Sequence, residues 1–198
     1  MSYSGRRLRA DPFTDLLFNI LLSFTLLMFL AIIFMNPIPK TGVINPKAEY
    51  IITVSWKDNN PDDVDTYVQS PTGDLVWFRG KEAGFVHLDR DDRGLLNDTI
   101  EINGEKVQNP LNQEVVTIRA VVPGEYIVNI HYYATKTEQP VDVNVKVEKV
   151  NPKLEVIYYG TIKLEKKGVE KTATRFNITQ DGAANVSGNL YKRLVPNN

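Results

Sequence analysis

The sequence contains no cysteine and only two histidines, His87 and His131. Disulfides, thiolate nucleophiles and zinc sites with cysteine ligands are therefore excluded. No spacing of serine, histidine and acidic residues suggests a catalytic triad, and no glycine-rich phosphate-binding loop occurs. The formal net charge is only −1, so the strongly basic composition typical of nucleic-acid binding is missing. We expect no enzyme activity, no cofactor and no nucleic-acid partner.

Long apolar runs are also missing, except for one near the N-terminus. Residues 16–35 contain only three polar side chains, Asn19, Ser23 and Thr25. As a helix, residues 13–35 would extend roughly 34 Å, slightly more than a hydrocarbon core of about 30 Å. We therefore expect a single transmembrane helix over residues 12–35. A cleaved signal peptide is the alternative, but its apolar region is normally about 7–15 residues long and ends at a small-residue cleavage site.

The residues around this run indicate its orientation. Arg6, Arg7 and Arg9 precede it, and short arginine-rich segments stay on the cytoplasmic side of a membrane. Residues 1–11 are thus expected in the cytoplasm, and everything after the helix in the periplasm of a bacterium with an inner membrane. Residues 36–47 contain three prolines and are expected to form an extended linker.

Two aspartates near the helix start have different expected roles. Asp11 followed by Pro12 is typical of a helix N-terminus, because aspartate accepts backbone hydrogen bonds and proline fits the first helical position. Asp15 lies beyond the cap, and at about 100° per residue Asp15, Asn19 and Ser23 fall within about 80° of one another. Such a polar stripe should avoid lipid and line an ion pathway. Alternatively, Asp15 reaches the cytoplasmic headgroups and has no function.

The segment PFTDLLFNILLSFTLLMFLAIIFM, with arginines before it and an extracytoplasmic domain after it, resembles the ion-channel subunit of the rotary stator family that includes ExbD, TolR and MotB. In ExbD and TolR a proline, an apolar residue and one further residue precede the ion-carrying aspartate, which implies that Asp15 is the carrier. MotB-like chains have Asp, two apolar residues and Thr, a register that implies Asp11 as carrier and Thr14 as the threonine. We favour Asp15 and count Thr14 in the pore stripe with Asn19 and Ser23.

This resemblance covers about the first 40 residues and implies an ion-conducting stator subunit. Two copies of the helix would pass through a ring of about five copies of a polytopic MotA-, ExbB- or TolQ-like membrane protein. Asp15 would carry H⁺ or Na⁺, and the ion flow would drive rotation of the ring. The outer domain would dimerise or bind an unidentified partner in the cell envelope. The alternative is a passive anchor that tethers a domain recognising a protein or a glycan.

From Ala48 onward, apolar and polar residues alternate with a period of two, which is typical of half-buried strands. This pattern predicts an antiparallel, jelly-roll-like β-sandwich over residues 48–182. His131 alternates with Tyr126 and Val128 and is expected to face solvent. Residues 183–198 lack a strand pattern and are expected to be a flexible tail. The expected strands are residues 50–56, 65–69, 74–79, 99–102, 114–121, 125–134, 141–147, 154–165 and 169–178.

Two segments of this domain, TVSWKDNNPDDVDTYVQSPTGDLVWF and PGEYIVNIHYY, resemble the small extracytoplasmic β-sandwich modules of the YfaP-like kind. The resemblance supports a sandwich rather than the mixed helix-and-strand domain with which MotB-type stators bind peptidoglycan.

Acidic residues are concentrated in two runs of the domain, DNNPDDVD at 58–65 and DRDDRGLLND at 89–98. Calcium binding is the functional interpretation. Counted from Asp89, however, the fifth position of an EF-hand loop would be Arg93 instead of an oxygen donor, and the interleaved arginines would neutralise a cation site. We therefore expect solvated aspartate-rich loops and no metal, with Asp89, Asp91 and Asp92 as the alternative ligands.

Overall fold

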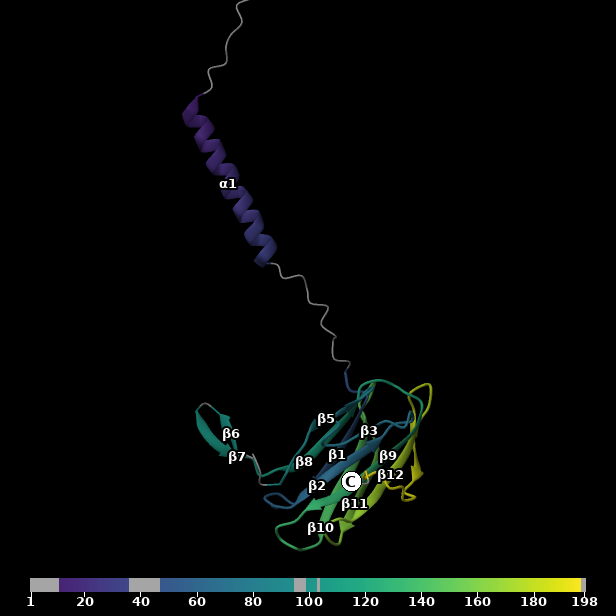
Figure 1. Ribbon diagram of the computed structural model, residues 1–198. Coiled ribbons are helices and arrows are strands. Elements are labelled where there is room, and N and C mark those ends of the chain that lie inside the picture. Colours follow the sequence, from purple (N-terminus) through teal and green to yellow (C-terminus); the bar gives the residue numbers. More distant parts are fainter. Residues whose placement is uncertain (1–10, 36–46, 95–98, 103, 197–198) are drawn as a thin grey trace, which may run out of the picture. The chain divides into compact units, whose positions relative to one another are not determined.

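The computed structural model describes residues 11–35, 47–94, 99–102 and 104–196. The chain divides into two compact units, residues 1–44 and 45–198, each of which is described by itself (Figure 1). The predicted cytoplasmic arginines and all but the last residue of the predicted linker at 36–47 lie outside the described residues.

The first unit contains one helix, α1 (Pro12–Met35), which starts at the proline that the sequence indicates. Its residues 12–32 are long and apolar enough to cross a membrane once, a criterion that a signal sequence at this position also meets. The only hydroxyl in the second half of the helix, on Thr25, donates to the carbonyl of Leu21 at 2.7 Å and is thereby satisfied within the helix.

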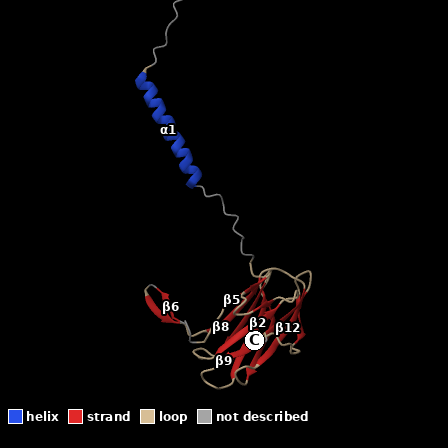
Figure 2. Cartoon of the chain, viewed as in Figure 1, coloured by secondary structure: helices blue, strands red, loops and turns tan. Residues whose placement is uncertain are grey.

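The second unit is a β-sandwich of two antiparallel sheets, which confirms the predicted fold class (Figure 2). In spatial order, the first sheet consists of β11 (Glu155–Leu164), β10 (Val141–Lys149), β1 (Tyr50–Trp56), β8 (Asn112–Ile118), β5 (Val86–Arg90) and β4 (Glu82–Ala83). The second consists of β13 (Ala184–Gly188), β12 (Glu170–Ile178), β9 (Gly124–Ala134), β2 (Asp63–Gln69) and β3 (Leu75–Val76). A separate hairpin is formed by β6 (Thr99–Ile102) and β7 (Glu105–Gln108).

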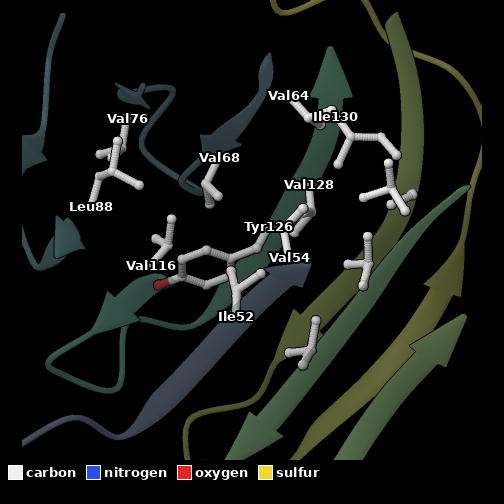
Figure 3. Close-up of a cluster of buried hydrophobic side chains, with 14 of the residues drawn as sticks. Ile52, Val54, Val64, Val68, Val76, Leu88, Val116, Tyr126, Val128 and Ile130 are labelled. Carbon is white, nitrogen blue, oxygen red and sulfur yellow. The ribbon is translucent and has the colours of Figure 1, made fainter. Parts of the chain in front are cut away.

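The core lies between the two sheets and uses the alternating apolar residues that the sequence shows. Ile52 and Val54 on β1 point toward Val128 and Ile130 on β9 of the other sheet (Figure 3). All four side chains are fully buried. Burial contributes about 25 cal/mol per Å² of apolar surface, so each of these core positions stabilises the sandwich.

Two strand predictions need correction. The expected strand at residues 74–79 is only two residues long, because Trp77 and Gly80 exchange backbone hydrogen bonds of 3.1 and 3.0 Å that turn the chain back. β4, β5, β7 and β13 lie outside the strands that the sequence predicts. β5 has only two buried apolar residues, Val86 and Leu88, and it is held by pairing with β8.

The expected flexible tail is also wrong over residues 183–196. β13 pairs with β12, and the residues after it cover the outer face of the second sheet. Leu194 is buried there against Tyr67 and Ile127. Glu170 fixes this segment, because its Oε1 accepts hydrogen bonds from the N–H groups of Leu194 (2.7 Å) and Val195 (3.1 Å).

His131 lies on this same outer face and is half-buried, so the prediction that it faces solvent is wrong. Its ring makes edge contacts with Tyr67 and Tyr133, at centroid distances of 6.0 and 6.2 Å. Burial lowers the pKa of His131 and thereby favours the neutral ring. Alternation along β9 correctly separates the two faces of the strand, but it does not reveal that later residues cover the outer one.

Candidate functional site

The two aspartates at the start of α1 lie in different environments. Both carboxylate oxygens of Asp11 accept hydrogen bonds, one from the N–H of Phe13 at 3.1 Å and the other from the hydroxyl of Thr14 at 2.9 Å. This is the geometry of an N-cap, in which a side chain satisfies the free donors of the first turn. Thr14, which we expected in the pore stripe, donates to the same cap.

Asp15 is not part of the cap. Its backbone N–H donates to the carbonyl of Asp11 at 3.1 Å, as in a regular helix, and its side chain is exposed on the helix surface. Asn19 and Ser23 are exposed on the next two turns. These three polar side chains therefore follow one another along a helix whose other polar side chains, Thr14 and Thr25, are hydrogen-bonded to Asp11 and to the Leu21 carbonyl.

In the β-sandwich, the expectation of solvated acidic loops holds for Asp58 and Asp89, which are exposed, and is wrong for Asp62, Asp65 and Asp92, which are buried. Asp62 is fully buried, and its carboxylate accepts hydrogen bonds from the hydroxyl of Tyr132 (2.7 Å), the N–H of Lys136 (2.6 Å) and both donors of Thr137. Burial alone would raise the pKa of Asp62, but the hydrogen bonds, first those from Thr137, outweigh it and lower the pKa to about 2. Asp62 is a structural anchor for the loop after β9.

Two of the three alternative metal ligands in the second acidic run are likewise committed to neighbours. Asp89 accepts a hydrogen bond from the hydroxyl of Thr117 at 2.6 Å and pairs with Arg119. Asp92 accepts hydrogen bonds from the N–H groups of Gly94 (3.1 Å) and Gln113 (3.2 Å), and Arg90 pairs with it at 2.9 Å. Only Asp91 remains as a candidate from this run.

Asp91 instead meets two carboxylates from distant parts of the chain. Asp65 on β2, Asp91 just after β5 and Glu114 on β8 each place an oxygen within 4.8 Å of the others. The site is almost closed to solvent, since Asp65 is 3% and Glu114 1% exposed, and the side chain of Asp91 is 5% exposed.

The hydrogen bonds around this carboxylate cluster are incomplete. Glu114 Oε2 accepts a hydrogen bond of 2.6 Å from the N–H of Thr66, on a part of β2 that lies beyond its pairing with β3. Glu114 Oε1 and Asp65 Oδ2 are buried, and neither has a hydrogen-bond partner among the described residues. Asp91 Oδ2 pairs with Lys81 Nζ at 2.9 Å.

Burial and mutual repulsion disfavour the ionised form of the carboxyl groups in this cluster when no cation is present. Burial raises the pKa of Glu114 well above its ordinary value and outweighs the opposing hydrogen bond from Thr66, and the charges of Asp65 and Asp91 raise it further. Burial, followed by the charges of Asp63 and Asp91, raises the pKa of Asp65 to about 8. Burial also raises the pKa of Asp63 to about 6. These groups therefore need either a proton or a positive charge beside them.

Sequence reasoning missed Glu114, although a signal for it exists. On β8 the buried positions alternate, and Glu114 takes the same side of the strand as Val116 and Ile118. A carboxylate at a core-facing position of an amphipathic strand is rare unless it has a partner.

No family model and no curated protein matches the sequence. Among solved structures, the crystal structure of SAV2460, a protein of unknown function, is similar with a TM-score of 0.46 and 14% sequence identity. The match covers 71% of this chain and 87% of that one.

Proposed function

We propose that this chain is an ion-conducting stator subunit of a rotary motor in the bacterial inner membrane, with Asp15 as the ion carrier. The supporting observation is the difference between the two aspartates of α1. Asp11 uses both carboxylate oxygens in the N-cap, whereas Asp15 is exposed beyond the cap on a helix of membrane-spanning length. Acidic residues in such helices are costly, and they typically face a protein interior or a water-filled path where they carry ions.

The polar groups next to Asp15 define where a partner would pack. Asn19 and Ser23 continue the same side of α1, and the remaining exposed side chains are almost all apolar. A lone helix cannot enclose a pore, so the proposal includes two copies of α1 within a ring of a polytopic MotA-, ExbB- or TolQ-like protein. The orientation follows from the arginines before the helix, with the β-sandwich in the periplasm.

In this mechanism, Asp15 binds H⁺ or Na⁺ from one side of the membrane, loses its net charge and releases the ion to the other side. Each change of charge alters which surface of the ring can pack against the stripe, and repeated changes rotate the ring. One elementary charge crossing 100 mV releases about 2.3 kcal/mol, enough to shift a two-state packing equilibrium by more than tenfold. The β-sandwich would dimerise or hold an envelope component, and no catalysis is assigned to it.

The decisive experiment compares Asp15→Asn with Asp11→Asn in the full chain, co-expressed with a MotA-, ExbB- or TolQ-like polytopic protein from the same organism. Asparagine keeps the size of aspartate, and at position 11 it remains a good N-cap. We expect both variants to co-purify with the partner in the wild-type ratio. Ion flux into proteoliposomes should be lost with Asp15→Asn and kept with Asp11→Asn.

A passive membrane anchor for the β-sandwich is the second candidate. The observation that favours it is the carboxylate cluster of Asp65, Asp91 and Glu114, because it gives the outer domain a built feature that a simple spacer would not need. Full cellular function of Asp15→Asn, or failure to find any polytopic partner on purification, would support the anchor and contradict the stator.

A further inference from the structure

The carboxylate cluster lies in the β-sandwich unit, and the proposed ion conduction through α1 does not use it. We infer that Asp65, Asp91 and Glu114 form a binding site for one calcium ion in the β-sandwich. Three oxygens from three separate segments converge within 4.8 Å of one another. Calcium ligands lie at about 2.3–2.6 Å from the ion, so opposite ligands are separated by about 4.6–5.2 Å, and the cluster fits inside that limit.

Buried carboxylate oxygens without hydrogen-bond partners are the second observation that indicates a bound cation. Glu114 is 1% exposed, yet its Oε1 has no hydrogen-bond partner among the described residues, and the same holds for Asp65 Oδ2. Buried carboxylate oxygens in folded proteins are normally paired, and leaving a charged one unpaired is costly. A cation between these oxygens would remove that cost for both residues at once.

The local charges match a divalent cation. Three ionised carboxylates carry a charge of −3, which the ammonium of Lys81, 2.9 Å from Asp91, and the more distant guanidinium of Arg93, 3.9 Å from the same oxygen, offset only in part. The interleaved arginines do not neutralise the cluster, as the sequence suggested they would. Arg90 pairs with Asp92 and donates to the carbonyl of Leu111, and the side chain of Arg93 is 55% exposed and 3.9 Å from Asp91.

The ligand set favours calcium over other metals. All three donors are carboxylate oxygens, which suit hard cations and not zinc or copper. Magnesium demands near-ideal octahedral geometry, gives up its water reluctantly and is usually held by only one or two carboxylates, whereas this cluster offers three. With three protein ligands and water completing the shell, we expect an affinity in the range of extracellular modules, about 10⁻⁴–10⁻³ M.

The position of the site gives the ion a structural effect. Asp65 belongs to the second sheet and Glu114 to the first, so a bound ion would connect the two sheets at Thr66, where β2 pairs with β9 on one side and β3 does not extend along the other. Asp91 would add the loop after β5. Calcium should therefore stabilise the sandwich as a whole.

The test uses the full chain in detergent micelles, purified in EGTA, with calorimetric titration of CaCl₂ and thermal unfolding followed by tryptophan fluorescence. At free calcium of 100 times the Kd, we expect Tm to rise by about 5–10 °C in the wild type. Glu114→Gln keeps an acceptor for the Thr66 N–H but removes the charge, and it should weaken calcium binding at least tenfold. Should this variant fail to fold, Asp65→Asn replaces it.

Asp89→Asn is the matched control, because Asp89 lies in the same acidic run but is held by Thr117 and Arg119. It should keep the full calcium response. The absence of binding heat and of a Tm shift in the wild type would overturn the assignment and would indicate carboxyl groups kept neutral by protons. A calcium-induced Tm shift in Glu114→Gln equal to that of the wild type, or its loss in Asp89→Asn, would also overturn it. So would a response of the wild type to MgCl₂ equal to its response to CaCl₂.

Discussion

Replacing Asp62 with alanine should destabilise the β-sandwich strongly and in a pH-dependent way. The fully buried carboxylate accepts hydrogen bonds from Tyr132, Lys136 and Thr137, and also from the hydroxyl of Thr135 at 3.0 Å. It thereby fixes the loop that connects β9 to β10. Alanine removes the acceptor and leaves these donors around an empty volume.

The magnitude follows from the pKa of Asp62. Burial would raise this pKa, but the hydrogen bonds lower it from 3.8 to about 2. At about 1.4 kcal/mol per pKa unit, the ionised carboxylate contributes about 2 kcal/mol of folding free energy at neutral pH. Donors left without acceptors add to the loss, so we expect Asp62→Ala to cost about 3–4 kcal/mol at pH 7.

The assay is urea unfolding of the full chain in detergent, followed by tryptophan fluorescence. Both tryptophans of the chain, Trp56 and Trp77, lie in the β-sandwich, so the signal reports on this unit alone. Because the folded pKa lies below the unfolded one, the contribution of Asp62 is complete above about pH 4 and is lost as the pH falls through about 2. The difference between wild type and variant should therefore shrink over this interval.

Asp58→Ala in the same acidic run is the control, because Asp58 is exposed, and little change is expected. The reasoning would be refuted by a cost below about 1 kcal/mol for Asp62→Ala at pH 7. A cost that stays constant between pH 5 and about 2 would equally contradict it, because it would separate the stability from the ionised carboxylate.

The remaining predictions concern the two ends of the chain and two glycines in turns. When this sequence is expressed, the protein purified from membranes should keep the uncleaved mass of 22.4 kDa, and a mass lacking α1 would identify a cleaved signal sequence instead. Glu170→Ala should release the segment around Leu194, seen as faster C-terminal trimming by carboxypeptidase, whereas unchanged trimming would show that apolar contacts suffice. Gly94→Ala should lower stability by roughly 2 kcal/mol or more, because a Cβ would lie 2.8 Å from the carbonyl oxygen of Pro61, and Gly104→Ala, with open space around it, should cost less.

Local patterns in the sequence were enough for the architecture. A helix of membrane-spanning length, its start at Pro12 after the capping Asp11, and most strands of the sandwich follow from the spacing of apolar and polar residues. Secondary structure is periodic over a few residues, so the alternation of Ile52 and Val54 with their polar neighbours already identifies a buried face. The choice of Asp15 over Asp11 used the same kind of local information, because capping depends only on the adjacent turn.

Only the tertiary structure decided which side chains meet. Asp65, Asp91 and Glu114 lie on three segments that come together through the order and register of β2, β5 and β8, and no local pattern encodes that order. The burial of His131 on the outer face of the second sheet and the packing of Leu194 there also depend on segments that are distant in the sequence. The alternation along a strand shows which of its two sides is apolar and which is charged. The residues that each side contacts come from segments far away in the sequence, and their packing also has to compensate the buried charges.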